Sequence, residues 1–194
     1  MDNIIWQWRR WEVTMIEEEW IKYAIKKYLS DETKAAINKE SQIIEKINNE
    51  WLNFVPKIVD KWDWWFKYYY IEWEDFNDVY DTSEDNVKNK LILELLERCY
   101  DLDKIWVVHW ELHRPFSNVL VNEKFKVFII DFDRWWFWEF NWKNLRSYAQ
   151  WLKNKDYLSI DDVRVIWQLQ ELDLIYKFIY DKLSKLYEQE QSEN

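Results

Sequence analysis

Apolar and polar residues alternate in part along two short runs near the start of the chain, residues 12–16 and 21–28. Alternation with a period of two is typical of half-buried β-strands, and an acidic turn over residues 17–20 separates the runs, so the pattern predicts a hairpin. Residues 30–49 change to helical spacing. Ser30 or Asp31 suits the N-cap of this predicted helix, and its apolar stripe comprises Ala36, Ile37, Ile43, Ile44 and Ile47.

The rest of the chain contains fewer strands and more helices. Residues 55–59 and 66–71 are predicted to be strands, and residues 86–102 a helix. The runs 119–121 and 127–130 predict a short hairpin. Residues 161–186 predict a long last helix. Because strand-rich sequence gives way to helix-rich sequence after Tyr70, we expect an α+β protein with parts 1–70 and 71–194.

Composition adds one anomaly to this picture. The 194 residues include no glycine and 17 tryptophans, whereas average usage predicts about 14 glycines. Many tryptophans stand beside charged residues in turn-like contexts, such as residues 6–11 and 62–65, where glycine is common. Our hypothesis is that most or all of them occupy glycine positions of a parent sequence. The alternative is a native tryptophan-rich protein that binds carbohydrate or another ligand.

Charge and cysteine content restrict the class of protein. A net charge of −10 argues against nucleic-acid binding through a broad basic face. The single cysteine, Cys99, excludes an internal disulfide and suits a reducing compartment. The N-terminus lacks the pattern of a signal peptide, and no apolar run reaches the ~18 residues of a membrane span. We therefore expect a cytoplasmic protein without a membrane span.

Four motifs emerge when each tryptophan is interpreted as glycine. Residues 6–13 become G-x-G-x-x-G-x-V, and residues 23–26, Tyr-Ala-Ile-Lys, follow on the next predicted strand. Residues 108–112 become V-H-G-E-L, and residues 129–133 are Ile-Ile-Asp-Phe-Asp. In this order and spacing the motifs resemble those of the protein-kinase-like superfamily. The resemblance extends from about Ile4 to Trp138.

The resemblance implies a bilobal fold with a small β-rich N-lobe and a reduced helical C-lobe. It is strongest to the compact, atypical branch: the RIO-type kinases, the kinase of the KEOPS complex and the Kdo/lipopolysaccharide-kinase-like proteins. Residues 69–74, which become Y-Y-I-E-G-E, resemble the hinge of that branch, and residues 130–134 resemble its metal motif. Only about sixty residues follow Asp131, so the helices of a large C-lobe are missing.

The resemblance also implies ATP and Mg²⁺ as cofactors and assigns roles to individual residues. Lys26 would bind the α/β-phosphates, with Glu40 of the first helix as its orienting partner and Glu45 as the fallback. Asn118 and Asp131 would bind Mg²⁺ through oxygen atoms. The loop that covers the phosphates would comprise Trp6, Gln7, Trp8, Arg9, Arg10, Trp11 and Val13.

The catalytic base is ambiguous. Glu111 matches the family's aspartate by motif, but it precedes Asn118 by seven positions instead of five, and His113 matches by distance. We prefer Glu111, because it directly follows the His109-Trp110 pair. The implied function is phosphoryl transfer from ATP to an unidentified acceptor, which is a Ser/Thr protein hydroxyl, a small molecule or a sugar lipid. ATP hydrolysis within a larger complex is a further alternative. The alternative is a catalytically inactive kinase-like scaffold, because tryptophans in the phosphate loop would crowd the nucleotide.

Overall fold

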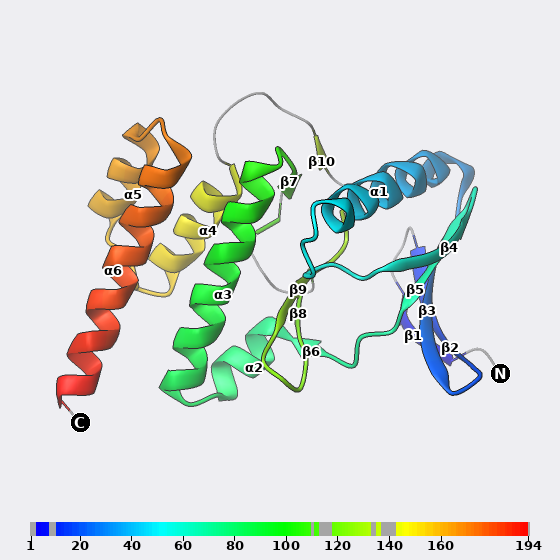
Figure 1. Cartoon of the computed structure of the whole chain (residues 1–194), viewed down its shortest axis with the longest axis horizontal. Coiled ribbons are helices and arrows are strands. Elements are labelled where there is room, and N and C mark those ends of the chain that lie inside the picture. The colour runs from blue at the N-terminus through cyan, green and yellow to red at the C-terminus, as the bar shows by residue number, and fades with distance from the viewer. Residues whose placement is uncertain are drawn as a thin grey trace. The chain divides into compact units, whose positions relative to one another are not determined.

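The computed structural model describes residues 3–7, 11–109, 111–112, 118–132, 135–136 and 143–193 (Figure 1). The chain divides into two units. The first comprises Met1–Trp73 and Phe128–Asp133, and the second comprises Glu74–Val127 and Arg134–Asn194. The lobes predicted from the sequence, 1–70 and 71–194, stay a prediction about functional domains.

The first unit contains a five-stranded antiparallel sheet in the order β1-β2-β3-β5-β4. The predicted hairpin is confirmed: its second strand has the predicted bounds, its first strand is longer than expected, and a two-residue turn joins them. The first strand of the sheet was not predicted, because it precedes any clear alternation. The strands are β1 (Asn3–Gln7), β2 (Trp11–Glu18), β3 (Ile21–Tyr28), β4 (Ile58–Trp62) and β5 (Trp65–Tyr69).

Helix α1 (Asp31–Asn49) contacts strands β3, β4 and β5 (Figure 1). The predicted apolar stripe is confirmed: Ile37, Ile43 and Ile47 are completely buried, and Ile44 is nearly so. Burying each such side chain contributes about 1.5–3 kcal/mol. This packing fixes α1 beside the strand that carries Lys26.

The second unit is mainly helical, and with the antiparallel sheet of the first unit it confirms the predicted α+β class. Helix α3 (Asp85–Lys104) contacts α4 and α6, and α4 contacts α5. The helix predicted over 86–102 is therefore confirmed, whereas α2 (Phe76–Thr82) and α4 (Lys143–Asn154) were not predicted. Five short strands complete the described elements: β6 (Glu74–Asp75), β7 (Val108–His109), β8 (Val119–Val121), β9 (Val127–Ile129) and β10 (Trp135–Trp136).

The single long helix predicted over 161–186 is wrong. The chain instead forms α5 (Ile160–Gln168) and α6 (Leu172–Glu193), and Leu169 between them is extended, with φ −67° and ψ 135°. Arg146 of α4 donates from Nη2 to the Leu169 carbonyl at 2.7 Å, which satisfies an acceptor that the break leaves outside a helix. No helix among the described residues combines the length and apolarity needed to cross a membrane.

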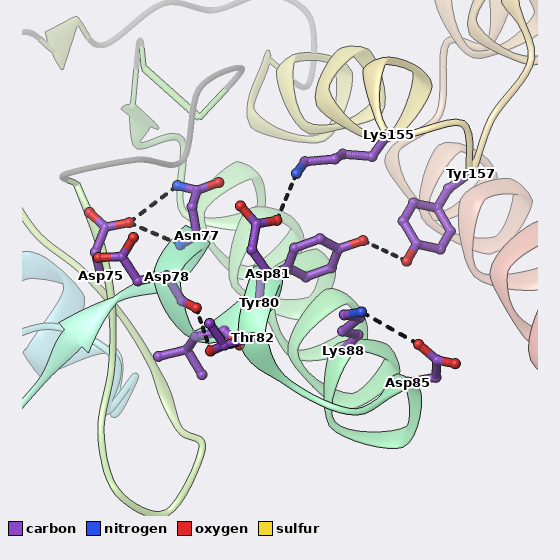
Figure 2. Close-up of polar contacts among 11 residues, drawn as sticks. Asp75, Asn77, Asp78, Tyr80, Asp81, Thr82, Asp85, Lys88, Lys155 and Tyr157 are labelled. Carbon is purple, nitrogen blue, oxygen red and sulfur yellow. Dashed lines mark hydrogen bonds and ion pairs between the residues drawn. The ribbon is translucent and has the colours of Figure 1, made fainter.

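Polar contacts fix both ends of α2 (Figure 2). Asp75 caps its N-terminus by accepting from the Asn77 backbone N–H at 2.9 Å. Near its C-terminus, the Tyr80 and Tyr157 hydroxyls are 2.6 Å apart, and Lys155 donates to Asp81 at 3.1 Å. These contacts tie α2 to the chain that follows α4.

Candidate functional site

Lys26 and Glu40 form a buried ion pair in the first unit. Lys26 lies on β3, in register with Val13 of β2 and Phe66 of β5, and its side chain is 5% exposed. Glu40 comes from the middle of α1 and is 2% exposed. The Lys26 Nζ donates to Oε1 and Oε2 of Glu40 at 3.0 and 2.9 Å. Lys26 and Glu40 thus lie together, as their proposed pairing requires.

Asp131 belongs to the same cluster. The Lys26 Nζ donates to its Oδ1 at 2.6 Å, and the carboxylate is 15% exposed. Three acceptor oxygens therefore match the three N–H donors of a lysine ammonium. Asp131 has φ 63°, a left-handed conformation that aspartate tolerates better than most residues other than glycine. In this conformation its carboxylate contacts Lys26.

Two more groups complete the hydrogen bonding of Glu40. The Tyr28 hydroxyl donates to Oε2 at 2.7 Å, and the Phe132 backbone N–H donates to Oε1 at 3.3 Å. The sequence reasoning missed Tyr28, although a signal was present: Tyr28 is two residues after Lys26, so both side chains point to the same face of β3.

Burial and charge act in opposite directions on these ionisable groups. Burial alone would lower the pKa of Lys26, but the Asp131 and Glu40 carboxylates outweigh it and hold that pKa well above its usual value. Burial raises the pKa of Glu40, and the Lys26 ammonium opposes this shift. Burial also raises the pKa of Tyr28, so its hydroxyl stays protonated and can donate. Lys26 is a permanent cation between two acidic side chains.

Trp11 covers Lys26. Its indole lies 4.4 Å from the Lys26 Nζ, measured to the ring centroid, and the residue is 4% exposed. This is a cation–π contact with a desolvated ammonium. Among the other residues predicted to form the phosphate loop, Trp6 pairs with Val13 and Gln7 with Glu12 in the β1–β2 ladder. Trp8, Arg9 and Arg10 lie outside the described residues.

Glu111 and Asn118 contact each other in the second unit. The Asn118 Nδ2 donates to Glu111 Oε2 at 2.5 Å, so the seven-residue spacing in sequence does not separate them in space. The Glu111 backbone N–H donates to His109 Nδ1 at 3.3 Å. His113, the other candidate base, lies outside the described residues.

Asn144 and Asp103 hold this segment in place through hydrogen bonds. The His109 backbone N–H donates to Asn144 Oδ1 at 2.8 Å, and Asn144 Nδ2 donates to Asp103 at 2.7 Å. Asp103 also accepts from the Leu145 backbone N–H at 3.0 Å. Burial raises the pKa of Asp103 to about 7, although these N–H donors oppose the shift. This network could not be predicted from the sequence, because its members are far apart along the chain and follow no motif.

The candidate metal ligands belong to different units: Asp131 to the first and Asn118 to the second. Both offer the oxygen atoms that Mg²⁺ prefers. Within the described part of the chain, no group of three or more His, Cys, Asp or Glu side chains forms a metal cluster.

No protein-family model matches the chain, and no curated protein does. A solved structure titled as the streptomycin–ATP–APH(2")-IIa ternary complex is similar, at 16% sequence identity and a TM-score of 0.45. The similarity covers 53% of this chain and 34% of that one, so the chain matches about a third of that protein's length.

Proposed function

We propose that the chain is an ATP- and Mg²⁺-dependent phosphotransferase of the protein-kinase-like superfamily. The observation that carries the proposal is the cluster in which Lys26 binds Glu40 and Asp131 at 2.6–3.0 Å. Ordinary surface lysines are not held in this way, and a buried cation oriented by a helical carboxylate suits phosphate binding. The motif order in the sequence supports the same function.

Each residue has a definite part in this proposal. Glu40 and Tyr28 orient the Lys26 ammonium, which binds phosphate oxygens once it exchanges part of its contact with Asp131. Glu111, held by Asn118, accepts the proton of the acceptor hydroxyl. Mg²⁺ held by Asp131 and Asn118 would neutralise the charge of the phosphates, and ATP would supply the phosphoryl group. Small-molecule hydroxyls and protein hydroxyls are the two acceptor classes to assay.

The fit of a nucleotide is limited by Trp11. The residues around Lys26 have the right chemistry, but the indole occupies the space 4.4 Å from its ammonium, where a glycine would leave room for phosphate. An inactive scaffold is therefore the second candidate for the chain as it stands. We therefore expect phosphate binding by a variant that has glycine at positions 6, 8 and 11.

Nucleotide binding tests the proposal. We expect W6G/W8G/W11G to gain a thermal shift with Mg-ATP that the unsubstituted chain lacks, and the further change K26M to abolish it. K61M is the matched control, because Lys61 makes an exposed ion pair with Glu45 in the same unit. A folded triple variant that shows no shift, or K26M binding as well as K61M, would contradict the function.

A further inference from the structure

Three tryptophans have positive φ, a backbone conformation that glycine adopts far more readily than tryptophan. Seven described residues other than glycine have positive φ, and three of them are Trp20, Trp51 and Trp106, although tryptophan makes up only 17 of 194 residues. Tryptophan is bulky and has no side-chain group that compensates locally for the left-handed conformation, whereas glycine adopts it freely. Each of the three positions belongs to a motif with a known residue preference.

Trp20 lies in the β2–β3 turn. Glu18 pairs with Ile21, which leaves a two-residue loop, and the loop residues Glu19 and Trp20 have φ 49° and 70°. Positive φ at both positions defines a type I′ turn, whose second position strongly prefers glycine. The Trp20 side chain contributes little packing, because the residue is 93% exposed.

Trp51 ends helix α1 in a Schellman motif. Its backbone N–H donates to the Asn48 carbonyl at 3.1 Å, and the Leu52 N–H donates to the Ile47 carbonyl at 3.2 Å. This pair of bonds places Trp51 at C′, with φ 61°, the position at which glycine is most strongly enriched in helices. Trp51 is 88% exposed.

Trp106 ends helix α3 in the same way. Its N–H donates to the Asp103 carbonyl at 3.2 Å, the Val107 N–H donates to the Leu102 carbonyl at 2.9 Å, and φ of Trp106 is 60°. Helix α4 provides an internal comparison, because its Schellman bonds place Asp156 at C′ with φ 64°. Aspartate tolerates this conformation. Two of these three helix ends thus have tryptophan where glycine is expected.

Trp151 is different. It lies within helix α4, is 3% exposed, and packs against the rings of Tyr148, Phe76 and Tyr80 at centroid distances of 5.4, 5.7 and 5.7 Å. An aromatic side chain is needed there to fill the space between three other rings. The structure therefore distinguishes two groups of tryptophans: one is buried and packs against other rings, and the other has positive φ at a turn or helix end.

We propose that positions 20, 51 and 106 carry glycine in the protein that the producing cell makes, and that position 151 carries tryptophan. Glycine at the first three positions would adopt the left-handed conformation without cost, and tryptophan at position 151 would keep the packing of the rings around it. The inference does not depend on the proposed function, since none of these positions belongs to the phosphate site.

Peptide mass spectrometry of the endogenous protein tests which residue each of these four positions carries. We expect the peptides that contain positions 20, 51 and 106 to have the mass of glycine at those positions, and the peptide that contains position 151 to have the mass of tryptophan. Tryptophan at 20, 51 and 106 would overturn the proposal, and so would glycine at 151.

Substitutions in the expressed chain test the backbone argument separately. At positions 20, 51 and 106 the glycine variant should melt above the alanine variant by a few degrees, about 2–4 °C. Trp167 is the matched control: it is 56% exposed but lies within helix α5, where alanine should melt above glycine. W151G should lower the Tm. Alanine melting at or above glycine at 20, 51 and 106 would contradict the assignment of these positions to glycine.

Discussion

Lys26 forms ion pairs with two carboxylates, and all three side chains are largely buried from solvent. Because its ammonium has three donors and meets three oxygens of Glu40 and Asp131, removing it would leave two buried negative charges uncompensated. Such losses cost about 3–5 kcal/mol in other proteins, far more than most surface ion pairs contribute. Loss of the Lys26 ammonium should therefore lower the free energy of unfolding strongly.

Asp103 should make stability depend on pH. Its pKa is raised from 3.8 to about 7 in the folded state, so the folded protein binds more protons than the unfolded chain between these values. The contribution of Asp103 is therefore complete below about pH 4 and is lost as the pH rises through 7, by on the order of 4 kcal/mol.

Urea unfolding of the unsubstituted chain and of D103N checks this prediction. The free energy of unfolding of the unsubstituted chain, minus that of D103N, should fall steadily from pH 4 to pH 7. A difference that stays constant, or that rises, over this range would show that Asp103 is ionised in the folded protein at acidic pH.

At the scale of elements, the apolar pattern predicted α1, α3 and the β2–β3 hairpin, but it missed α2 and α4 and merged α5 with α6. Helix α1 and the β2–β3 hairpin follow their patterns closely, since α1 buries Ile37, Ile43 and Ile47 and the half of the hairpin away from its turn is mostly buried. The break between α5 and α6 could not be predicted, because apolar residues continue across it at three-residue intervals, as they do on one helix: Ile166, Leu169, Leu172 and Ile175. A tertiary contact from Arg146 to the Leu169 carbonyl accompanies the break, and no pattern in the sequence indicates it.

Arg146 should therefore stabilise this break. R146M leaves the Leu169 carbonyl without the guanidinium donor in a buried setting, which we expect to cost about 1–3 kcal/mol. Hydrogen exchange should accelerate at the start of α6, and the urea midpoint should fall. R164M is the control, since Arg164 pairs with Asp161 on an exposed surface of α5 and should change stability by less than about 0.5 kcal/mol. Equal effects of the two changes would contradict the role of Arg146.

For the whole molecule, sequence reasoning found residues in the order in which a known family uses them, and it anticipated the Lys26–Glu40 pair. It did not find Tyr28, Asn144 or Asp103, which act by holding other residues in place. Positions of this kind depend on which elements pack together, and no short motif encodes that. The same limit applied to the tryptophans: the sequence contains no glycine, but only the backbone angles identify Trp20, Trp51 and Trp106 as positions with positive φ.

The choice between Glu111 and His113 as the base is a prediction for the whole molecule, because it requires phosphoryl transfer by a complete site. In a chain with glycine restored at positions 6, 8, 11 and 110, we expect E111Q to lower kcat far more than H113N. The contact between Asn118 Nδ2 and Glu111 Oε2 at 2.5 Å favours Glu111, since it fixes that carboxylate beside a candidate metal ligand.

A positioned base contributes about 10²–10⁴-fold to the rate, so single-turnover phosphate transfer to a panel of hydroxyl acceptors would distinguish the two variants. Both changes are nearly isosteric, and equal circular dichroism spectra would confirm that each variant is folded. If H113N is the more damaging change, the base follows the five-residue spacing to Asn118 and Glu111 serves to position Asn118. If neither change lowers kcat, the acceptor loses its proton without help from this loop.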